Sequence, residues 1–192
     1  MDQYVESLHK KTLKTIQIFR KNNVTNISNP AYWKPVSINE IFKEIKRGKR
    51  LIKKNQKIGN IPYISSTALN NGVDNLISNN KNVRFFSNCI TLANSGSVGA
   101  TFYHPYKFIA SDHVTSLINN DFNKYIYLFI TATIRHQIQG KYDFNREISD
   151  KRINKEMIML PFDKNNQLDF YYMENYMKQI QNSHIDKLSI LK

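Results

Sequence analysis

Six short runs of β-branched and aromatic residues, separated by turns rich in Asn, Gly and Ser, dominate the middle of this 192-residue chain. Runs of this length bounded by turn residues are typical of β-strands joined as hairpins. No regular alternation of strand and helix runs through them, so the sequence does not favour a parallel α/β sheet. It predicts instead a twisted, mostly antiparallel sheet. The runs lie at residues 61–65, 83–86, 89–93, 100–104, 107–110 and 113–118.

Two helices are expected to pack on this sheet. The first begins with Ser37 as the N-cap of a capping box and ends before Gly48. The second covers residues 121–139, where apolar residues recur on one face, and its predicted N-cap is Asn120 or Asp121. Because helices and strands occupy separate stretches, the predicted fold class is α+β, with helices packed on a mostly antiparallel sheet.

The pattern divides the chain into four segments. A strand at residues 157–161 closes the globular domain and is expected to stop at Pro161. Apolar residues at mostly helical spacing also occur towards both ends of the chain, outside this domain. The predicted segments are an N-terminal amphipathic helix at 1–21, a linker at 22–32, the globular domain at 33–168 and a C-terminal helix at 169–192.

The C-terminal helix carries an apolar stripe that needs a partner. Its apolar residues begin at alternating spacings of three and four, as in the seam of a coiled coil. The stripe packs either on the helix's own domain or on another helix, and the sequence leaves both alternatives open. In the second case the assembly residues are Met173, Met177, Ile180 and Leu188.

Positive charge is abundant, and much of it lies in one stretch. The chain has 28 Lys and Arg against 15 Asp and Glu, which gives a net charge of +13. Residues 43–57 alone hold eight cations and one Glu. A solvated surface is the ordinary explanation of such a run, but with the global surplus a nucleic-acid backbone is the favoured partner. The predicted phosphate contacts are Lys46, Arg47, Lys49, Arg50, Lys53 and Lys54.

Phosphate contacts carry no sequence information, so other residues would have to read the bases. Two loops, at residues 65–72 and 94–99, are rich in amide and hydroxyl side chains. Asn can pair with the edge of adenine, and Ser and Thr can donate or accept, although the same residues also suit turns without any ligand. The candidate base or groove contacts are Ser65, Ser66, Thr67, Asn70, Asn71, Asn94, Ser95, Tyr103, Lys141 and Arg146, with Arg146 as the best guanine reader.

No pattern in the sequence points strongly to a catalytic or metal centre. The single cysteine, Cys89, excludes an internal disulfide and a multi-thiolate metal site, and the five histidines lack ligand spacing. The carboxylates of Asp143, Glu147 and Asp150 could serve a metal-dependent nuclease. Because cations flank them in the sequence, an ion-paired surface explains these acids more simply.

Nothing in the sequence predicts a membrane segment. No apolar run approaches the roughly 18 residues that a spanning helix needs. The first ten residues are polar throughout, so no signal peptide is expected and the predicted location is the cytoplasm.

A series of short motifs along residues 33–178 resembles the target recognition domain of specificity subunits in type I and related restriction–modification systems. Each motif is weak alone, but their order and spacing are fairly specific for this family. The motifs are Trp33, Glu40-Ile41-Phe42, Arg47-Gly48-Lys49, Gly59-x-Ile61-Pro62-Tyr63-Ile64, Asn71-Gly72-Val73, Asn88-Cys89-Ile90-Thr91, Ser95-Gly96-Ser97-Val98-Gly99, Phe102-Tyr103-His104-Pro105, Asp112-His113-Val114, Lys141-Tyr142, Leu160-Pro161 and Asp169…Met173-Glu174-x-Tyr176.

This resemblance implies a reader of double-stranded DNA without catalysis of its own. Such a domain recognises one half of a split target, and a helix that leaves it docks a methyltransferase subunit and, in some systems, a restriction subunit. The resemblance implies no cofactor for this chain, since S-adenosylmethionine is bound by the methyltransferase. The resemblance assigns no base contact to any individual residue of this chain, because recognition residues in the family vary with the DNA sequence that is read.

The chain departs from the family in one respect. A usual specificity subunit has two recognition domains and two helical spacers, whereas this sequence shows one domain with short helical ends. A half-subunit that forms a homodimer through its terminal helices, a truncated product and the specificity part of a fused enzyme are the alternatives. A metal-dependent nuclease and an RNA-binding module remain as functions of another class.

Overall fold

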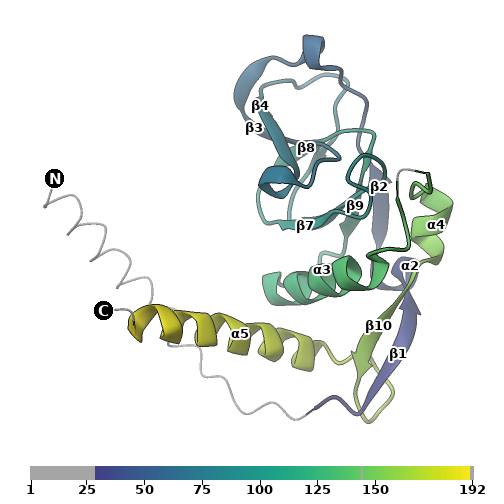
Figure 1. Cartoon of the computed structure of the whole chain (residues 1–192), viewed down its shortest axis with the longest axis vertical. Coiled ribbons are helices and arrows are strands. Elements are labelled where there is room, and N and C mark those ends of the chain that lie inside the picture. The colour runs from purple at the N-terminus through teal and green to yellow at the C-terminus, as the bar shows by residue number, and fades with distance from the viewer. Residues whose placement is uncertain (1–28, 144, 191–192) are drawn as a thin grey trace, which may run out of the picture.

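The computed structural model describes the backbone of residues 29–143 and 145–190, and side chains as far as residue 184. In this part of the chain the strands form two four-stranded sheets and one two-stranded ladder (Figure 1). The predicted N-terminal helix at 1–21 and linker residues 22–28 lie outside the described residues. The predicted α+β class with mostly antiparallel pairing is confirmed, but the hairpin runs are divided between two sheets.

The first four-stranded sheet is antiparallel throughout and lies next to the longest helix of the domain. Its order is β2 (Glu44–Arg47), β9 (Val114–Ile118), β6 (Cys89–Ala93) and β7 (Thr101–His104). Every residue of β6 is buried, since successive side chains of a strand point to opposite faces and both faces are covered. Ile90 packs towards helix α3, whereas Cys89 packs with residues of the second sheet.

The second sheet has the order β4 (Val73–Ile77), β3 (Ile58–Ile64), β8 (Phe108–Ala110) and β5 (Phe85–Phe86). Its β3–β8 pair is parallel and the other two pairs are antiparallel. Strand β3 begins three residues before the predicted run, and β4 has no counterpart in the prediction. Its sequence, VDNLI, buries only Ile77 and therefore carries little of the apolar signal that marks a strand.

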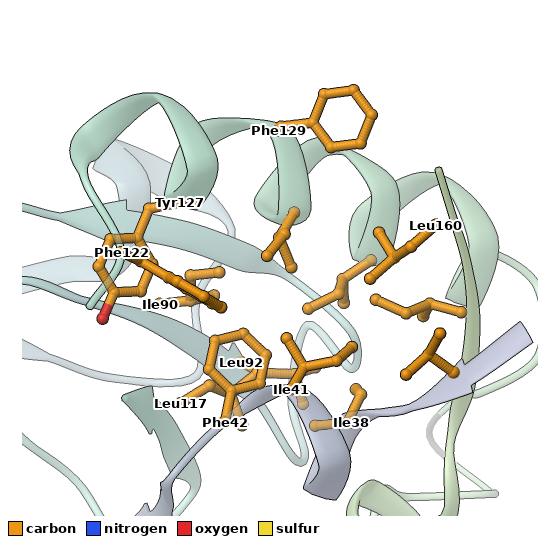
Figure 2. Close-up of a cluster of buried hydrophobic side chains, with 14 of the residues drawn as sticks. Ile38, Ile41, Phe42, Ile90, Leu92, Leu117, Phe122, Tyr127, Phe129 and Leu160 are labelled. Atoms are coloured by element: carbon orange, nitrogen blue, oxygen red, sulfur yellow. The ribbon is translucent and has the colours of Figure 1, made fainter. Parts of the chain in front are cut away.

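Helix α3 (Lys124–Ile138) covers the first sheet and supplies much of the main core (Figure 2). Its predicted apolar face is confirmed, and Ile130 and Ile134 are completely buried. The predicted cap is wrong: Asn123 is the N-cap, and its side chain accepts hydrogen bonds from the amides of Tyr125 and Ile126. The helix therefore starts later than the sequence signals indicated.

The helix predicted to follow Ser37 is largely wrong. Only one turn forms, α2 (Ile38–Ile41), and Ser37 makes no side-chain cap. The next residues leave the helix because Glu44–Arg47 pair with β9 as strand β2. Apolar residues spaced for a helix across 38–45 are here shared between a helical turn and a strand, and the tertiary pairing decides the local structure.

The remaining elements include a pair of strands that lies at the lower right of the molecule in Figure 1. Strand β1 (Tyr32–Ser37) pairs with β10 (Met157–Phe162), and helix α4 (Asp150–Lys155) directly precedes β10. Pro161 does not end β10, because the strand has a partner on one side only and needs no second ladder bond there. The two short 3₁₀ turns are η1 (Lys53–Asn55) and η2 (Leu69–Gly72).

Helix α5 (Phe170–Ile190) confirms the predicted C-terminal helix and packs along α3. Met173 is completely buried in the main core, so the start of the apolar stripe packs on its own domain. Among the helices in the described residues, none is long and apolar enough to cross a membrane.

Candidate nucleic-acid interface

Four loop segments meet at the ends of the two sheets and form one surface, called here the loop face. Backbone hydrogen bonds hold them in place: Asn94 N–H donates to the carbonyl of His113 at 2.8 Å, and Lys49 N–H donates at 3.0 Å to the carbonyl of Ala110, the last residue of β8. The amide of Ser97 donates to Ser66 at 2.9 Å. The loop face consists of residues 49–56, 65–72, 94–99 and 111–113.

Close backbone contact fixes where the basic segment enters the loop face. A Cβ atom on Gly48 would lie 2.1 Å from the carbonyl oxygen of Ala110, far inside van der Waals contact. Only glycine fits this position without movement of the backbone. The predicted role of Gly48 as a helix stop is therefore replaced by a close crossing between β2 and the residues after β8.

Most of the predicted phosphate contacts lie exposed on the loop face. Lys49, Arg50, Lys53 and Lys54 are all solvent-exposed, and the last two belong to η1. Lys46 lies just before this face on β2, where its ammonium group is 2.9 Å from the carboxylate of Glu44. The structure places two of these cations, Arg50 and Lys53, beside Ser65 and Ser66 of the first polar loop.

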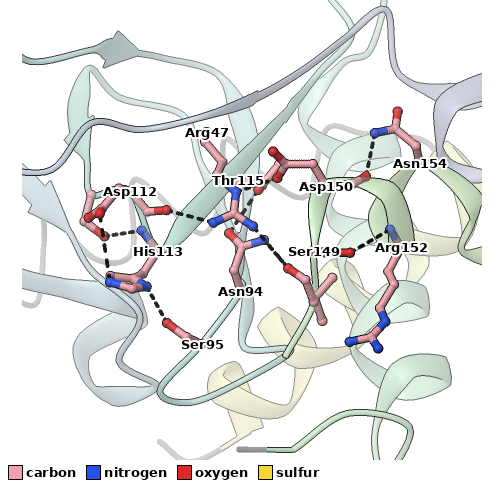
Figure 3. Close-up of polar contacts among 12 residues, drawn as sticks. Arg47, Asn94, Ser95, Asp112, His113, Thr115, Ser149, Asp150, Arg152 and Asn154 are labelled. Atoms are coloured by element: carbon pink, nitrogen blue, oxygen red, sulfur yellow. Dashed lines mark hydrogen bonds and ion pairs between the residues drawn. The ribbon is translucent and has the colours of Figure 1, made fainter. Parts of the chain in front are cut away.

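Arg47 differs from the other five cations because the protein itself uses its guanidinium group. The side chain pairs with the carboxylate of Asp150 and donates to the carbonyls of Asp112 at 3.2 Å and Ile148 at 3.3 Å (Figure 3). With these donors engaged, Arg47 is a brace between β2, the β8–β9 turn and the start of α4. It is no longer a candidate for phosphate contact.

The polar loop at 65–72 presents two amide side chains to solvent. Asn70 and Asn71 are exposed and adopt left-handed backbone angles, with φ of 48° and 54°. Asn tolerates this conformation better than other residues that carry a Cβ. Thr67 accepts a hydrogen bond from the Leu69 amide at 3.1 Å, while Ser65 and Ser66 are half-buried beside the basic segment.

The second polar loop contains one predicted contact that the structure contradicts. Asn94 is 2% exposed, and its amide nitrogen donates to Ile148 at 2.9 Å while its oxygen accepts from Thr115 at 3.0 Å. Both ends of the side chain are therefore used inside the protein. Ser95 is also buried, but its hydroxyl lies 2.6 Å from Nδ1 of His113, which is exposed on the loop face.

Removing the Asn94 side chain is expected to destabilise the fold. Asn94→Ala leaves the buried Thr115 hydroxyl without its acceptor and removes one of the two side-chain donors to the carbonyl of Ile148. The loss should cost about 2 kcal/mol of unfolding free energy. Urea denaturation followed by circular dichroism measures this loss. Asn75→Ala, which removes an exposed bond to Gln56, is the matched control and should cost less than about 0.5 kcal/mol. Equal losses in the two variants would contradict the assigned role.

Three further predicted contacts lie away from the loop face. Tyr103 is on β7, where its ring stacks on Tyr127 with centroids 5.1 Å apart and its pKa is raised by burial. Lys141 pairs with the carboxylate of Glu156 at 2.7 Å. Arg146 is exposed and lies over the ring of Tyr142, at 5.5 Å from the centroid. Tyr103 belongs to the core, whereas Lys141 and Arg146 belong to a second basic cluster.

This second basic cluster surrounds helix α4, and the sequence analysis predicted only Lys141 and Arg146 of it as contacts. A cavity of about 600 Å³ is lined there by Lys151, Arg152 and Lys155. Burial and the hydrogen bond to Glu156 raise the pKa of Tyr142, at the edge of the same cavity, to about 12. The acids between these cations in the sequence hid the cluster, although Ser149 as a helix N-cap before Asp150 gave a usable signal.

The carboxylates proposed for nuclease chemistry do not assemble into a metal site. One carboxylate oxygen of Asp143 accepts hydrogen bonds from the amides of Asn145 and Arg146, which is a turn cap. Asp150 pairs with Arg47. Among the residues that the structure describes, no group of three or more His, Cys, Asp or Glu side chains could hold a metal ion.

The predicted assembly residues have different surroundings. Met173 is buried in its own core, which corrects its assignment to an interface. Met177 and Ile180 are half-buried and line a groove of about 430 Å³ between α3 and α5. Two partly exposed rings, Trp33 and Tyr176, line the same groove. The side chain of Leu188 lies outside the described residues.

Solved structures of restriction–modification subunits share this fold. The S subunit of the type I restriction–modification system from M. genitalium matches 97% of this chain and 47% of its own, with a TM-score of 0.59 and 15% identity. The HsdS subunit from Thermoanaerobacter tengcongensis matches 99% of this chain and 50% of its own, with a TM-score of 0.55 and 12% identity. At these identities the likeness concerns the fold alone.

Sequence comparison extends the likeness beyond the fold. The type II restriction enzyme BgcI specificity subunit S.BcgI of Heyndrickxia coagulans is 30% identical over 191 residues, which cover 97% of this chain and 55% of the relative. The chain thus spans about half the length of the relatives it matches. The family model described as type I restriction modification DNA specificity domain matches residues 30–190. This chain therefore belongs to the family of type I restriction–modification DNA specificity domains.

Proposed function

We propose that this chain recognises a sequence in double-stranded DNA and directs a methyltransferase to it, with no catalytic activity of its own. The observation that carries the proposal is the loop face, where Arg50 and Lys53 adjoin the start of the loop that presents the exposed amides of Asn70 and Asn71. Cations of this kind hold phosphates, and amides can read base edges. Membership of the DNA specificity family supports the same assignment.

The proposed partners follow from this role. A methyltransferase subunit would bind S-adenosylmethionine and perform the chemistry, so we propose no cofactor for this chain. A restriction subunit is a further proposed partner. Within the proposal, the residues that contact phosphates are Lys46, Lys49, Arg50, Lys53 and Lys54. The residues that contact bases or grooves are Ser65, Ser66, Thr67, Asn70, Asn71, Lys141 and Arg146. Ser95 is buried and is left out of this set.

Selection of bound sites from a random duplex library tests the proposal. The full chain is used alone and with its cognate methyltransferase, at about 150 mM salt so that non-specific phosphate attraction is partly screened. We expect one short motif, single or split, to be enriched. Folded protein that enriches no motif in either condition would overturn the proposal. Parallel incubations with structured RNA and with Mg²⁺ test the RNA-binding and nuclease alternatives.

We further propose that the groove between α3 and α5 receives a helix of a second copy of this chain. Its partly exposed aromatic rings at Trp33 and Tyr176 are the kind of residue that anchors protein interfaces. Met177 and Ile180 would contribute apolar contacts from the same wall of the groove.

The proposed homodimer gives a direct prediction. Tyr176→Asp should weaken self-association at least tenfold, because a charge would enter the centre of an apolar contact. Sedimentation equilibrium measures the dissociation constant. Leu69→Asp makes the same change at an apolar residue that is 74% exposed on the loop face, and it should leave the dimer intact. A wild-type chain that stays monomeric at high concentration would contradict this assembly.

A further inference from the structure

One carboxylate lies among the cations of the loop face. Asp112 is in the turn between β8 and β9, and its side chain is 33% exposed. Together with Arg50, Ser65, Ser66 and His113 it lines a cavity of about 260 Å³. A carboxylate that faced phosphates directly would be repelled by them, so its place in a surface for DNA needs a reason.

The fold itself makes little use of this carboxylate. Its oxygen lies 4.0 Å from the Arg50 guanidinium group and 4.0 Å from Nε2 of His113, at the outer limit of ion pairing. No hydrogen bond to either carboxylate oxygen is present among the described residues. The Arg47 brace uses the backbone carbonyl of Asp112, which any residue would provide. Holding the turn together therefore does not require Asp at this position.

The neighbouring histidine is oriented so that it complements the carboxylate. Its Nδ1 atom lies 2.6 Å from the Ser95 hydroxyl, on the side away from Asp112 (Figure 3). When that hydroxyl donates to Nδ1 of the neutral ring, the proton of the imidazole is on Nε2. The pair then presents one donor, Nε2–H of His113, beside one acceptor, the carboxylate of Asp112.

This pattern matches a specific chemical feature of DNA. In the major groove, adenine presents the N7 acceptor beside the N6 amino donor, and a cytosine–guanine pair presents the N4 amino group beside the guanine O6. A carboxylate accepts a hydrogen bond from such an amino group and finds none on thymine. Arg50 and Lys53 nearby offset the repulsion between the carboxylate and the phosphates.

We propose that Asp112, placed beside His113, is a specificity-determining residue that accepts a hydrogen bond from the exocyclic amino group of adenine or cytosine in the major groove. The inference rests on the proposed function, because it names a base-reading residue within that function. It adds Asp112 and His113 to the loop-face residues inferred from composition.

The test repeats the site selection with Asp112→Ala in the full chain, with its methyltransferase. We expect the preference at one position of the motif to fall roughly ten- to a hundredfold, while the other positions keep theirs. Binding to unrelated DNA should stay equal or become tighter, because one negative charge is lost. Asp121→Ala removes the same charge from an exposed carboxylate that pairs with Lys43, and it should leave the motif unchanged.

A second variant, Asp112→Asn, distinguishes adenine from cytosine as the base that is read. It also tests the inference if Asp112→Ala does not fold. An amide pairs with both N6 and N7 of adenine. If the wild-type base is adenine, the Asn variant retains it; if the base is cytosine, the preference moves to adenine. Either result supports the inference.

Two other outcomes overturn it. A wild-type motif that stays unchanged in both Asp112 variants, or a preference that weakens evenly at all positions, would show that Asp112 reads no base. In that case the proposed function survives. If the wild-type complex enriches no motif, the proposed function fails and the inference fails with it.

Discussion

A variant that combines Lys49→Gln, Lys53→Gln and Lys54→Gln is expected to bind duplex DNA about a hundredfold more weakly than the wild type at moderate salt. Each exposed lysine of the loop face is assigned one phosphate contact, worth about 1 kcal/mol. Each lost contact also reduces the number of released counterions. The slope of log affinity against log salt should therefore become less steep by about 2.7. Fluorescence anisotropy across a salt series measures both quantities.

A matched control separates local contact from general charge. Lys34→Gln, Lys164→Gln and Lys178→Gln remove the same three charges near β1, β10 and α5, at the other end of the molecule in Figure 1. This variant should lose no more than about threefold in affinity, since exposed charges beyond a Debye length of about 10 Å are largely screened. Equal losses in the two variants would show that the loop face is not where phosphates bind.

The elements that the sequence predicted best are those in which burial and local pattern agree. The run Cys89–Ala93 is apolar or β-branched at nearly every position, and it forms the strand that is buried on both faces. Helix α3 has a continuous apolar face over fifteen residues, so its existence was clear although its cap was not. The prediction of a helix at Glu44–Arg47 was wrong because the apolar spacing of this segment fits both a helix and a strand. Pairing with β9 makes it a strand.

The candidate site was predicted in part, for a related reason. Residue type and charge identified the basic segment, because exposed lysines need no particular tertiary contact. Arg47 and Asn94 were wrongly predicted to contact DNA. Their side chains instead bind Ile148 and Asp150, which are distant from them in the sequence. Those partners come close only after folding. Contacts between residues distant in sequence are what pattern reasoning cannot supply.

The buried side chain of His104 makes the stability of this fold depend on pH. The ring of His104 is completely buried between β6, β7 and β8, where it lies 5.0 Å from the ring centroid of Phe108. Its Nε2 is 2.8 Å from the Thr91 hydroxyl and its Nδ1 is 3.0 Å from the Tyr106 hydroxyl. Both nitrogens of the neutral ring are thus satisfied. Burial lowers the pKa of His104 from 6.5 to about 4, because the charged ring would lose its hydration.

Acidification from pH 7 to pH 4 is therefore expected to remove about 3 kcal/mol of stability through His104. The pKa is 6.5 in the unfolded chain and about 4 in the fold, so between these values the unfolded state binds more protons. At about 1.4 kcal/mol per pKa unit, this difference lowers the unfolding free energy as pH falls from 6.5 towards 4. More than about one pH unit above 6.5 the histidine is neutral in both states and contributes no slope.

Urea denaturation at several pH values measures this effect, with His104→Gln as the comparison. The glutamine amide can still donate to Thr91 but does not titrate, so the variant should lose most of the slope between pH 6.5 and pH 4, whatever its stability at pH 7. A smaller slope should persist near pH 4 from Glu174, whose pKa is lowered chiefly by its hydrogen bond to Lys178. Identical slopes in the variant and the wild type, or an NMR titration of His104 near pH 6.5, would show that the buried ring does not govern acid stability.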